Sequence, residues 1–485
     1  MSSPARGPGR RAKIVCTLGP AVDGPDATLQ LMQNGMDAAR INMSFGSPEE
    51  HVRRIRDVRS LMGPTQRPVA VIADLPGRKI RVGQLQGGSV QLETGDTARF
   101  VVDEGQRGDA RQLPVQLGFF HENMSRGDPI LLSDGVVELE VADIRRNEVE
   151  AEVIYGGQVG EKTGVHCQGV PTSGPPITEQ DRPLLQLAIE ERADYVALSW
   201  VSDDRDLLVA REMMAEMGRE IPIIAKIERP EAFARLDGIL RRADAVMIRR
   251  GDLGAQMEVT RVPSVQKEIL RLANRAGVPV IIATQMLGSM IEAPRPTRAE
   301  ASDVSNAIAD GADGVLLSAE TAIGDFPVDS VAMMARIVRE TELEGVDRLQ
   351  TPILKEGASF AETTASIAVD AANRIGAKMI VCFTESGRTA ELVARSRPRM
   401  PILAFCRSNR TRRRLALPWG VRTDRMVGAE DVESLVDQVE DRVTGRGLAE
   451  AGDRLVLVFG SPMGASGRTN TVRLHRVSGG SAGSR

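Results

Sequence analysis

The sequence predicts an α/β protein whose largest part is a (β/α)₈ barrel, and three observations carry this prediction. Strand-like apolar runs alternate with helical patterns in eight β-then-α units, which favours a closed barrel over an open sheet. One stretch, from about residue 77 to residue 170, lacks helical periodicity and indicates an all-β insert after the third strand. A further α/β pattern follows residue 349.

Length and composition limit the classes of protein to which the chain can belong. At 485 residues it is too long for one ordinary core, so we expect roughly two to four domains. The net charge of −4 gives no general attraction to nucleic acid or anionic membranes, and no apolar run reaches membrane-spanning length. The four cysteines form no C-x-x-C pair, which argues against a disulfide scaffold or a thiolate zinc site. We therefore predict a cytoplasmic protein without a nucleic-acid or membrane partner.

The barrel elements are predicted in chain order from hydrophobic periodicity and capping signals. Ser47, Pro48 and two glutamates begin one helix, and a similar start occurs at Thr178. Strands are expected at 13–18, 37–43, 69–75, 195–201, 221–227, 245–248, 279–284 and 314–318, with helices including 26–32, 262–276 and 298–309.

The other two parts are predicted from changes in this pattern. Short alternating runs at 89–92, 136–141 and 149–154 lie between Gly, Asp and Asn turns and predict the strands of the insert. After a link at 349–357 we expect helices at 361–374 and 389–396 and strands at 379–383, 402–405 and 454–459. The predicted domains are thus 1–76 with 171–348, 77–170, and 349–485.

Polar side chains follow nearly every predicted barrel strand, at the end where barrel enzymes carry their active sites. Period-two alternation places Lys226 beside Glu228 on one strand face. Alone, this pair would favour a structural ion pair at a strand end over a functional site. The same strand ends also carry Arg40, Asn42, Ser44, Asp74, Ser199, Asp252, Thr284 and Glu320, which stability alone does not explain.

The residue types at these strand ends indicate metal-assisted chemistry on an anion. Glu228 and Asp252 offer hard oxygen ligands suited to Mg²⁺ or Mn²⁺. Arg40 and Lys226 offer positive charge to a phosphoryl group, and Gly251 allows close approach of backbone amides to an anion. The residues therefore predict metal-assisted phosphoryl or enolate chemistry.

Seven motifs occur in order along the predicted barrel. They are KIVCTLGP at 13–20, ARINMS at 39–44, KIE at 226–228, RGDLG at 250–254, ATQML at 283–287, PRPTRAE at 294–300 and SAET at 318–321. In these motifs and in their order the chain resembles the pyruvate kinase family, and weaker similarity continues to residue 471.

The resemblance implies a TIM barrel, a small β-barrel lid inserted after strand three, a C-terminal regulatory domain and a homotetramer. It implies phosphoryl transfer from phosphoenolpyruvate to ADP. The expected roles are phosphoryl binding by Arg40, charge neutralisation by Lys226, divalent-ion binding by Glu228 and Asp252, substrate binding by Gly251 and Asp252, and a position for Thr284 near the protonated face of the enolate. Asn42 and Arg81 are expected to contact the nucleotide.

One departure from the family pattern concerns potassium. The family commonly reads DTKGPEIR after strand three, whereas this chain reads DLPGRKIR at 74–81. The resemblance places a K⁺ site at the positions of Asn42, Ser44, Asp74 and Leu75, and Lys79 replaces the usual glutamate beside it. We therefore predict that Lys79 supplies the monovalent charge and that K⁺ is not required. The alternative is that Lys79 points to solvent.

Further departures leave the nucleotide and substrate open. Phe45 replaces a usual histidine, and Arg249 replaces a small residue beside the expected carboxylate site. In the predicted lid, residues 161–165 match the family loop loosely and Ser173 replaces an aspartate. These changes keep two alternatives open: a paralogue acting on another enol phosphate or nucleotide, and a weakly active regulatory protein.

The C-terminal domain carries a candidate effector site, formed by Thr384, Ser386, Gly387, Arg388, Thr389 and Arg468. Hydroxyls and amides at a helix start suit a phosphate, and the loop resembles the family's site for phosphorylated effectors. An ordinary capped helix explains the same pattern. The Arg-rich run at 407–414 lacks interleaved aromatics, so a solvated face or a subunit contact is favoured over nucleic-acid binding.

Overall fold

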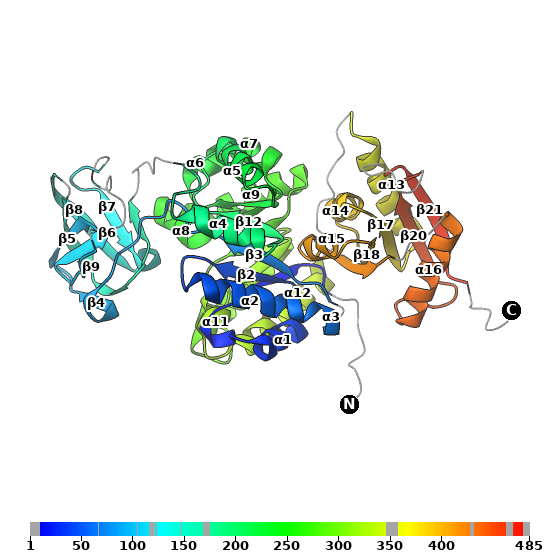
Figure 1. The fold of residues 1–485 in the computed structure, drawn as a ribbon, viewed down its shortest axis with the longest axis horizontal. Helices are drawn as coiled ribbons and strands as arrows, with labels where there is room; N and C mark the ends of the chain where they lie inside the picture. Colours follow the sequence, from blue (N-terminus) through cyan, green and yellow to red (C-terminus); the bar gives the residue numbers. More distant parts are fainter. Residues whose placement is uncertain are drawn as a thin grey trace.

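The computed structural model describes residues 10–65, 67–103, 105–115, 121, 124–146, 148–167, 175–345, 357–426, 431–461 and 469–478. Three parts lie in a row, with the barrel between an all-β domain on one side and the C-terminal α/β domain on the other (Figure 1). This arrangement places the insert at one end of the barrel and the C-terminal domain at the opposite end.

The predicted barrel is confirmed as a closed, eight-stranded parallel sheet in the order β1-β16-β15-β14-β13-β12-β3-β2. Each strand lies within a few residues of its predicted position. The strands are β1 (Lys13–Thr17), β2 (Ala38–Asn42), β3 (Ala70–Asp74), β12 (Tyr195–Leu198), β13 (Ile223–Ile227), β14 (Ala245–Arg249), β15 (Val280–Ala283) and β16 (Gly314–Leu317).

Helices surround the barrel, and the helix predicted at Ser47 begins at its capping signal. The helix predicted at Thr178 begins three residues later, at Asp181, without a side-chain cap. Ser47 accepts a hydrogen bond from the backbone N–H of Glu50, whose carboxylate accepts one from the N–H of Ser47, so α2 begins with a full capping box. The helices are α1 (Pro25–Asn34), α2 (Pro48–Ser60), α3 (Met62–Thr65), α4 (Asp181–Glu190), α5 (Asp204–Glu216), α6 (Pro230–Ala234), α7 (Leu236–Arg242), α8 (Arg250–Gln256), α9 (Val262–Ala276), α10 (Arg298–Ala309), α11 (Ala319–Ala322) and α12 (Pro327–Gly345).

The all-β insert predicted from the sequence is confirmed. The resemblance implied a small β-barrel, and the described strands form two sheets. The six-stranded sheet has the order β11-β7-β8-β9-β5-β6, and β10 pairs with β4 separately. The strands are β4 (Ser89–Leu92), β5 (Thr97–Val102), β6 (Gln112–Val115), β7 (Pro129–Leu132), β8 (Val137–Arg145), β9 (Glu148–Tyr155), β10 (Gly157–Gly160) and β11 (Val165–Cys167). Ile80 and Val82 are buried in the same core, so the chain joins this domain directly after leaving β3.

The C-terminal domain is a five-stranded sheet in the order β19-β18-β17-β20-β21, with only β21 antiparallel. Helices α13 and α14 cover one face and α16 covers the other. The elements are α13 (Phe360–Ile375), β17 (Met379–Phe383), α14 (Arg388–Arg395), β18 (Ile402–Cys406), α15 (Asn409–Arg414), β19 (Val421–Arg425), α16 (Val432–Gly445), β20 (Arg454–Phe459) and β21 (Thr471–Arg476).

Side chains of the C-terminal domain close the amino-terminal end of the barrel. Leu417 and Ala416 join one buried cluster with the inward-facing residues of the barrel strands, from Val15 of β1 to Leu316 of β16. Around this contact Lys13 Nζ donates to the carbonyl oxygen of Val421 at 2.7 Å. The interior core of the barrel therefore includes residues from a second domain.

Part of the Arg-rich run lies in this same contact. Arg413 Nε is 2.9 Å from Asp194 Oδ1, and Arg410 Nη2 donates to the carbonyl oxygen of Glu220 at 3.2 Å. These two arginines bind the barrel of their own chain. The sequence had predicted a solvated face or a subunit contact instead. Short strand β19, edge strand β21 and helices α15 and α16 were not predicted, and the predicted link lies largely outside the described residues.

Candidate active site

The site lies at the carboxyl ends of the barrel strands because the inward-facing row of each strand continues into it. Along β3, Ala70 and Ile72 face the barrel interior, so Asp74 faces the same way one step further on. The same alternation carries Arg40 from β2 and Lys226 from β13 inward. The barrel interior thus changes from apolar to charged between one inward-facing position of a strand and the next, two residues further along.

Asp74 holds two basic side chains in position. Its Oδ2 accepts a hydrogen bond from Arg40 Nε at 2.6 Å, and its Oδ1 accepts one from Lys226 Nζ at 3.1 Å. Burial would raise the pKa of this carboxyl, but the adjacent Lys226 and Arg40 lower it well below the usual range. Asp74 is therefore ionised and orients the two cations. Arg40 Nη1 also donates to Thr17 Oγ1 at 3.0 Å.

Glu228 is fixed beside Lys226 by a backbone donor. The N–H of Trp200 donates to Glu228 Oε2 at 2.6 Å, while Oε1 lies 3.3 Å from Lys226 Nζ. Lys226 Nζ also donates to Ser199 Oγ at 2.5 Å. The pair anticipated from the sequence is present, buried, and connected to a neighbouring strand end.

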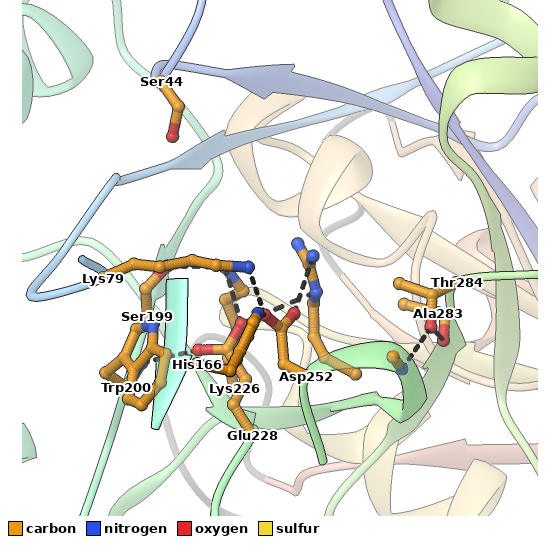
Figure 2. Close-up of polar contacts among 12 residues, drawn as sticks. Ser44, Lys79, His166, Ser199, Trp200, Lys226, Glu228, Asp252, Ala283 and Thr284 are labelled. Atoms are coloured by element: carbon orange, nitrogen blue, oxygen red, sulfur yellow. Dashed lines mark hydrogen bonds and ion pairs between the residues drawn. The ribbon is translucent and has the colours of Figure 1, made fainter. Parts of the chain in front are cut away.

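Asp252 is buried at the start of α8, and basic side chains from several elements contact its carboxylate. Lys79 Nζ contacts its Oδ1, and Arg249 Nη2 lies 2.8 Å from its Oδ2. Burial would raise the pKa of Asp252, but Arg249 and then Lys79 hold it well below the usual value. Figure 2 shows Lys79, Lys226, Glu228 and Asp252 converging from the insert and the barrel.

His166 of β11 also reaches this cluster, although nothing in the sequence singled it out. Its Nε2 lies 3.5 Å from Asp252 Oδ1, and its ring stacks on Trp200 with the ring centroids 6.1 Å apart. Burial, and then the charge of Lys79, lower the pKa of His166 to about 4. The imidazole is therefore neutral near pH 7. Only a spatial contact between domains could have revealed it.

Lys79 does not point to solvent, so that alternative is wrong. Its side chain is 9% exposed and its ammonium group pairs with Asp252. Arg81 instead approaches the other predicted residues, because its Nη2 donates to Ser44 Oγ at 3.2 Å and its guanidinium lies 5.7 Å from the centre of the Phe45 ring. In Figure 2 the Lys79 side chain extends toward Asp252, whereas Ser44 lies apart from this contact.

The predicted monovalent-ion region is divided between two sets of contacts. Asp74 is bound to Arg40 and Lys226, as described above. Ser44 is contacted by Arg81, and the N–H of Ser44 donates to Asn42 Oδ1 at 3.3 Å. Leu75 is buried directly after β3, and its carbonyl oxygen accepts from Ser199 Oγ at 2.7 Å.

Thr284 is turned toward α8 by an unusual backbone conformation. It has a φ of 74° and Gln285 follows with a φ of 54°, both in the left-handed region that β-branched residues rarely adopt. This turn breaks the alternation of β15, and Thr284 Oγ1 accepts a hydrogen bond from the N–H of Gly251 at 3.0 Å. Thr284 Oγ1 also donates to the carbonyl oxygen of Ala283 at 2.6 Å.

The C-terminal candidate site is a turn before α14. Thr384 Oγ1 accepts from the N–H of Gly387 at 2.9 Å, and Ser386 Oγ accepts from the N–H of Arg388 at 3.4 Å. Thr389 Oγ1 forms a hydrogen bond with Thr469 Oγ1 at 2.7 Å. These hydroxyls already have partners within the chain. Arg468 lies outside the described residues.

The carboxylates fit a hard divalent cation. Glu228 and Asp252 are both buried. Asp252 Oδ2 makes no hydrogen bond among the described groups, although the guanidinium of Arg249 faces it. Within the described ranges no cluster of three or more His, Cys, Asp or Glu side chains has metal-binding geometry. Two carboxylate oxygens with water and substrate completing the shell match the way proteins bind Mg²⁺.

The fold and this site define an enzyme built on a (β/α)₈ barrel. Comparison with known proteins identifies the family to which it belongs. The model described as pyruvate kinase, barrel domain matches residues 9–331, and that described as pyruvate kinase, alpha/beta domain matches residues 362–475. The chain belongs to the pyruvate kinase family, and its activity class is phosphotransferase.

Curated relatives match over nearly the whole chain. The pyruvate kinase of Corynebacterium efficiens is 41% identical over 472 residues, which cover 96% of this chain and 98% of the relative. That of Corynebacterium glutamicum is 40% identical over 468 residues, covering 96% and 97%. That of Geobacillus stearothermophilus is 39% identical over 475 residues, covering 97% and 81%. Within the described residues, no helix is both long and apolar enough to cross a membrane.

Proposed function

We propose that this chain transfers the phosphoryl group of phosphoenolpyruvate to ADP, giving pyruvate and ATP, as the last step of glycolysis. The observation that supports this most is the convergence of Arg40 and Lys226 on Asp74, in the same cluster of charged side chains as Glu228 and Asp252. Phosphoryl transfer through a loose transition state needs positioning and charge neutralisation more than covalent help, and this cluster supplies both.

In this proposal the two basic side chains bind the phosphoryl group, and one carboxylate holds both of them in position. Arg40 binds the transferring phosphoryl group, and Lys226 neutralises its charge in the transition state. Asp74 keeps both side chains extended, because it accepts a hydrogen bond from each. Preorganised charge of this kind requires little reorganisation during the reaction.

Glu228 and Asp252 hold the divalent ion, Mg²⁺ or Mn²⁺. When bound there, the ion supplies Lewis-acid charge stabilisation to the substrate oxygens. The amides of Gly251 and Asp252 bind the substrate carboxylate at the start of α8, and the N–H of Gly251 exchanges its hydrogen bond with Thr284 Oγ1 when the carboxylate binds. Thr284, whose hydroxyl is already hydrogen-bonded to the N–H of Gly251, lies beside the enolate and assists its protonation through water.

The matched test compares a buried lysine with an exposed one. Lys226→Met should lower pyruvate formation from phosphoenolpyruvate, ADP and Mg²⁺ by about a thousandfold or more, as expected when a main transition-state charge is removed. Lys267→Met, on a side chain that is 61% exposed and pairs with Asp310, should retain the parent rate. Equal activity in the two folded variants would contradict the proposed role of Lys226.

We further propose that the enzyme does not require K⁺. Lys79 and Arg81 bring two fixed cations into the site, and Arg81 contacts Ser44, one of the oxygens assigned to a monovalent ion. A further cation would be repelled there. Activity should be equal with K⁺ and with a bulky inert cation at fixed ionic strength. A strong increase on adding K⁺ would contradict this proposal while leaving the kinase activity intact.

The nucleotide, effector and assembly complete the proposal. Asn42 and Arg81 are proposed to contact ADP, and the turn at Thr384 to Thr389, with Arg468, to bind a phosphorylated effector. We propose that the protein is cytoplasmic and forms a homotetramer. Light scattering would test the tetrameric state directly. A second candidate function, transfer from another enol phosphate or to another nucleotide, is favoured by the position of Arg249 on the metal carboxylates. A substrate panel with the purified protein distinguishes the two.

A further inference from the structure

Arg249 ends β14 and directs its side chain into the active site. Ala245 and Met247 on the same strand face the barrel interior, so residue 249 continues that row. The guanidinium contacts two carboxylates at once: Nη2 is 2.8 Å from Asp252 Oδ2, and Nε is 3.5 Å from Glu228 Oε1. The side chain is 19% exposed, so these ion pairs are shielded from bulk water.

The oxygens that Arg249 contacts are those that are not bound by the N–H of Trp200 or by Lys79. Glu228 Oε2 is taken by the N–H of Trp200, and Asp252 Oδ1 is taken by Lys79. Glu228 Oε1 faces Arg249 together with Lys226, and Asp252 Oδ2 faces Arg249. Each carboxylate therefore has one anchored oxygen and one oxygen directed at the same guanidinium.

We propose that Arg249 is a built-in competitor of the divalent cation at Glu228 and Asp252 and sets the affinity of this site. The inference rests on the proposed assignment of these two carboxylates to the metal. An ion bound to Glu228 Oε1 and Asp252 Oδ2 takes the oxygens that the guanidinium contacts, so Arg249 leaves them when the ion binds. Divalent-ion affinity is reduced by the free energy of the ion pairs that are lost.

The test is direct Mn²⁺ binding to the full chain without phosphoenolpyruvate or nucleotide, followed by the electron paramagnetic resonance signal of free Mn²⁺. Arg249→Gln, which keeps a similar shape without charge, should bind Mn²⁺ more tightly by about tenfold or more, the effect of removing one charged hydrogen-bonding partner. Arg249→Lys keeps a charge with a single-point donor and should fall between the parent and Arg249→Gln.

The matched control is Arg242→Gln, on an exposed arginine that pairs with Asp204 on the barrel surface, and it should bind Mn²⁺ like the parent. Unchanged or weaker Mn²⁺ binding by both Arg249 variants would overturn the proposal. Circular dichroism of each variant establishes that it is folded. If only one Arg249 variant folds, its Mn²⁺ affinity relative to the parent decides the question by the same criterion.

Two further variants separate this inference from the proposed metal site. Glu228→Gln and Asp252→Asn should each weaken Mn²⁺ binding by about tenfold or more, because each removes one charged ligand. Parent-like Mn²⁺ binding by both would show that the metal site itself is misassigned, which overturns the Arg249 inference with it. Weakened binding in both, together with no gain in the Arg249 variants, would overturn the competitor role alone.

Discussion

Replacing Leu417 with alanine should destabilise the barrel, although Leu417 belongs to the C-terminal domain. Its side chain is 1% exposed and packs in one cluster with the inward-facing residues of the barrel strands. The substitution leaves the chain connectivity and the charged contacts at this end of the barrel in place. It therefore isolates the apolar contribution of the C-terminal domain to the barrel core.

The expected loss follows from burial and packing. Truncating a buried leucine to alanine removes the transfer free energy of its missing methyl and methylene groups and leaves a cavity, and such changes cost about 2–5 kcal/mol. The cluster that contains Leu417 includes residues from all eight barrel strands, which limits relaxation into the cavity, so we expect about 3 kcal/mol. At that magnitude, barrel amides that exchange by global opening should exchange about 100-fold faster.

Hydrogen exchange resolved by segment is the suitable assay, because a protein with several domains need not unfold in one step. Amides of β3 and β14 report on the barrel, and those of β17 report on the C-terminal domain. The control is Leu474→Ala on β21, a leucine that is 55% exposed, which should change exchange little. Faster exchange confined to β17 and its neighbours, with the barrel unchanged, would refute the reasoning.

Three further predictions concern stability. Burial lowers the pKa of Lys13 from 10.5 to about 8, so between these values the unfolded chain binds a proton that the folded chain has released. The free energy of unfolding of the parent relative to Lys13→Met should therefore rise with pH across this range, by up to about 3 kcal/mol, in urea titrations at several pH values; a flat difference would contradict it. Asp194→Asn removes the charge that faces Arg59 and Arg413 and should cost about 3 kcal/mol in urea unfolding, whereas a cost near zero would show that these pairs are not coupled to stability. Ser47→Ala removes the capping hydroxyl of α2 and should cost about 1 kcal/mol, with Ser47→Thr restoring most of it.

The barrel was predictable because its signals are local. Each strand is a short apolar run, and α9 and α10 begin and end at their predicted residues because period, caps and breakers agree there. Strand β21 was missed because all six of its residues are partly or fully exposed, and the alternation of Val472 and Leu474 with Arg473 and His475 is too short to indicate a buried face. Helix α15 was missed because six polar residues, four of them arginines, carry no apolar period.

The site was predictable only as far as strand parity reaches. Arg40, Asp74 and Lys226 meet because consecutive inward positions share one face. The contacts of His166 and Arg81 depend on how the insert seats on the barrel, which no periodicity encodes. The strained turn at Thr284 is likewise a tertiary result, since intrinsic preference opposes a left-handed threonine.

The seating of the insert also has an electrical meaning. Lys79 and Arg81 approach the site from a segment whose neighbouring residues, Ile80 and Val82, are buried in the insert's own core. Lys162, whose backbone N–H donates to the carbonyl oxygen of Val82, reaches the carbonyl oxygen of Ser44. A shift of the insert away from the barrel would carry these positive charges with it and leave Asp74, Glu228 and Asp252 balanced only by the barrel's own Arg40, Lys226 and Arg249. The net charge of the site therefore depends on the position of the insert. Because ionic strength screens such attractions, it should influence how firmly the insert is held against the barrel as well as how tightly anions bind.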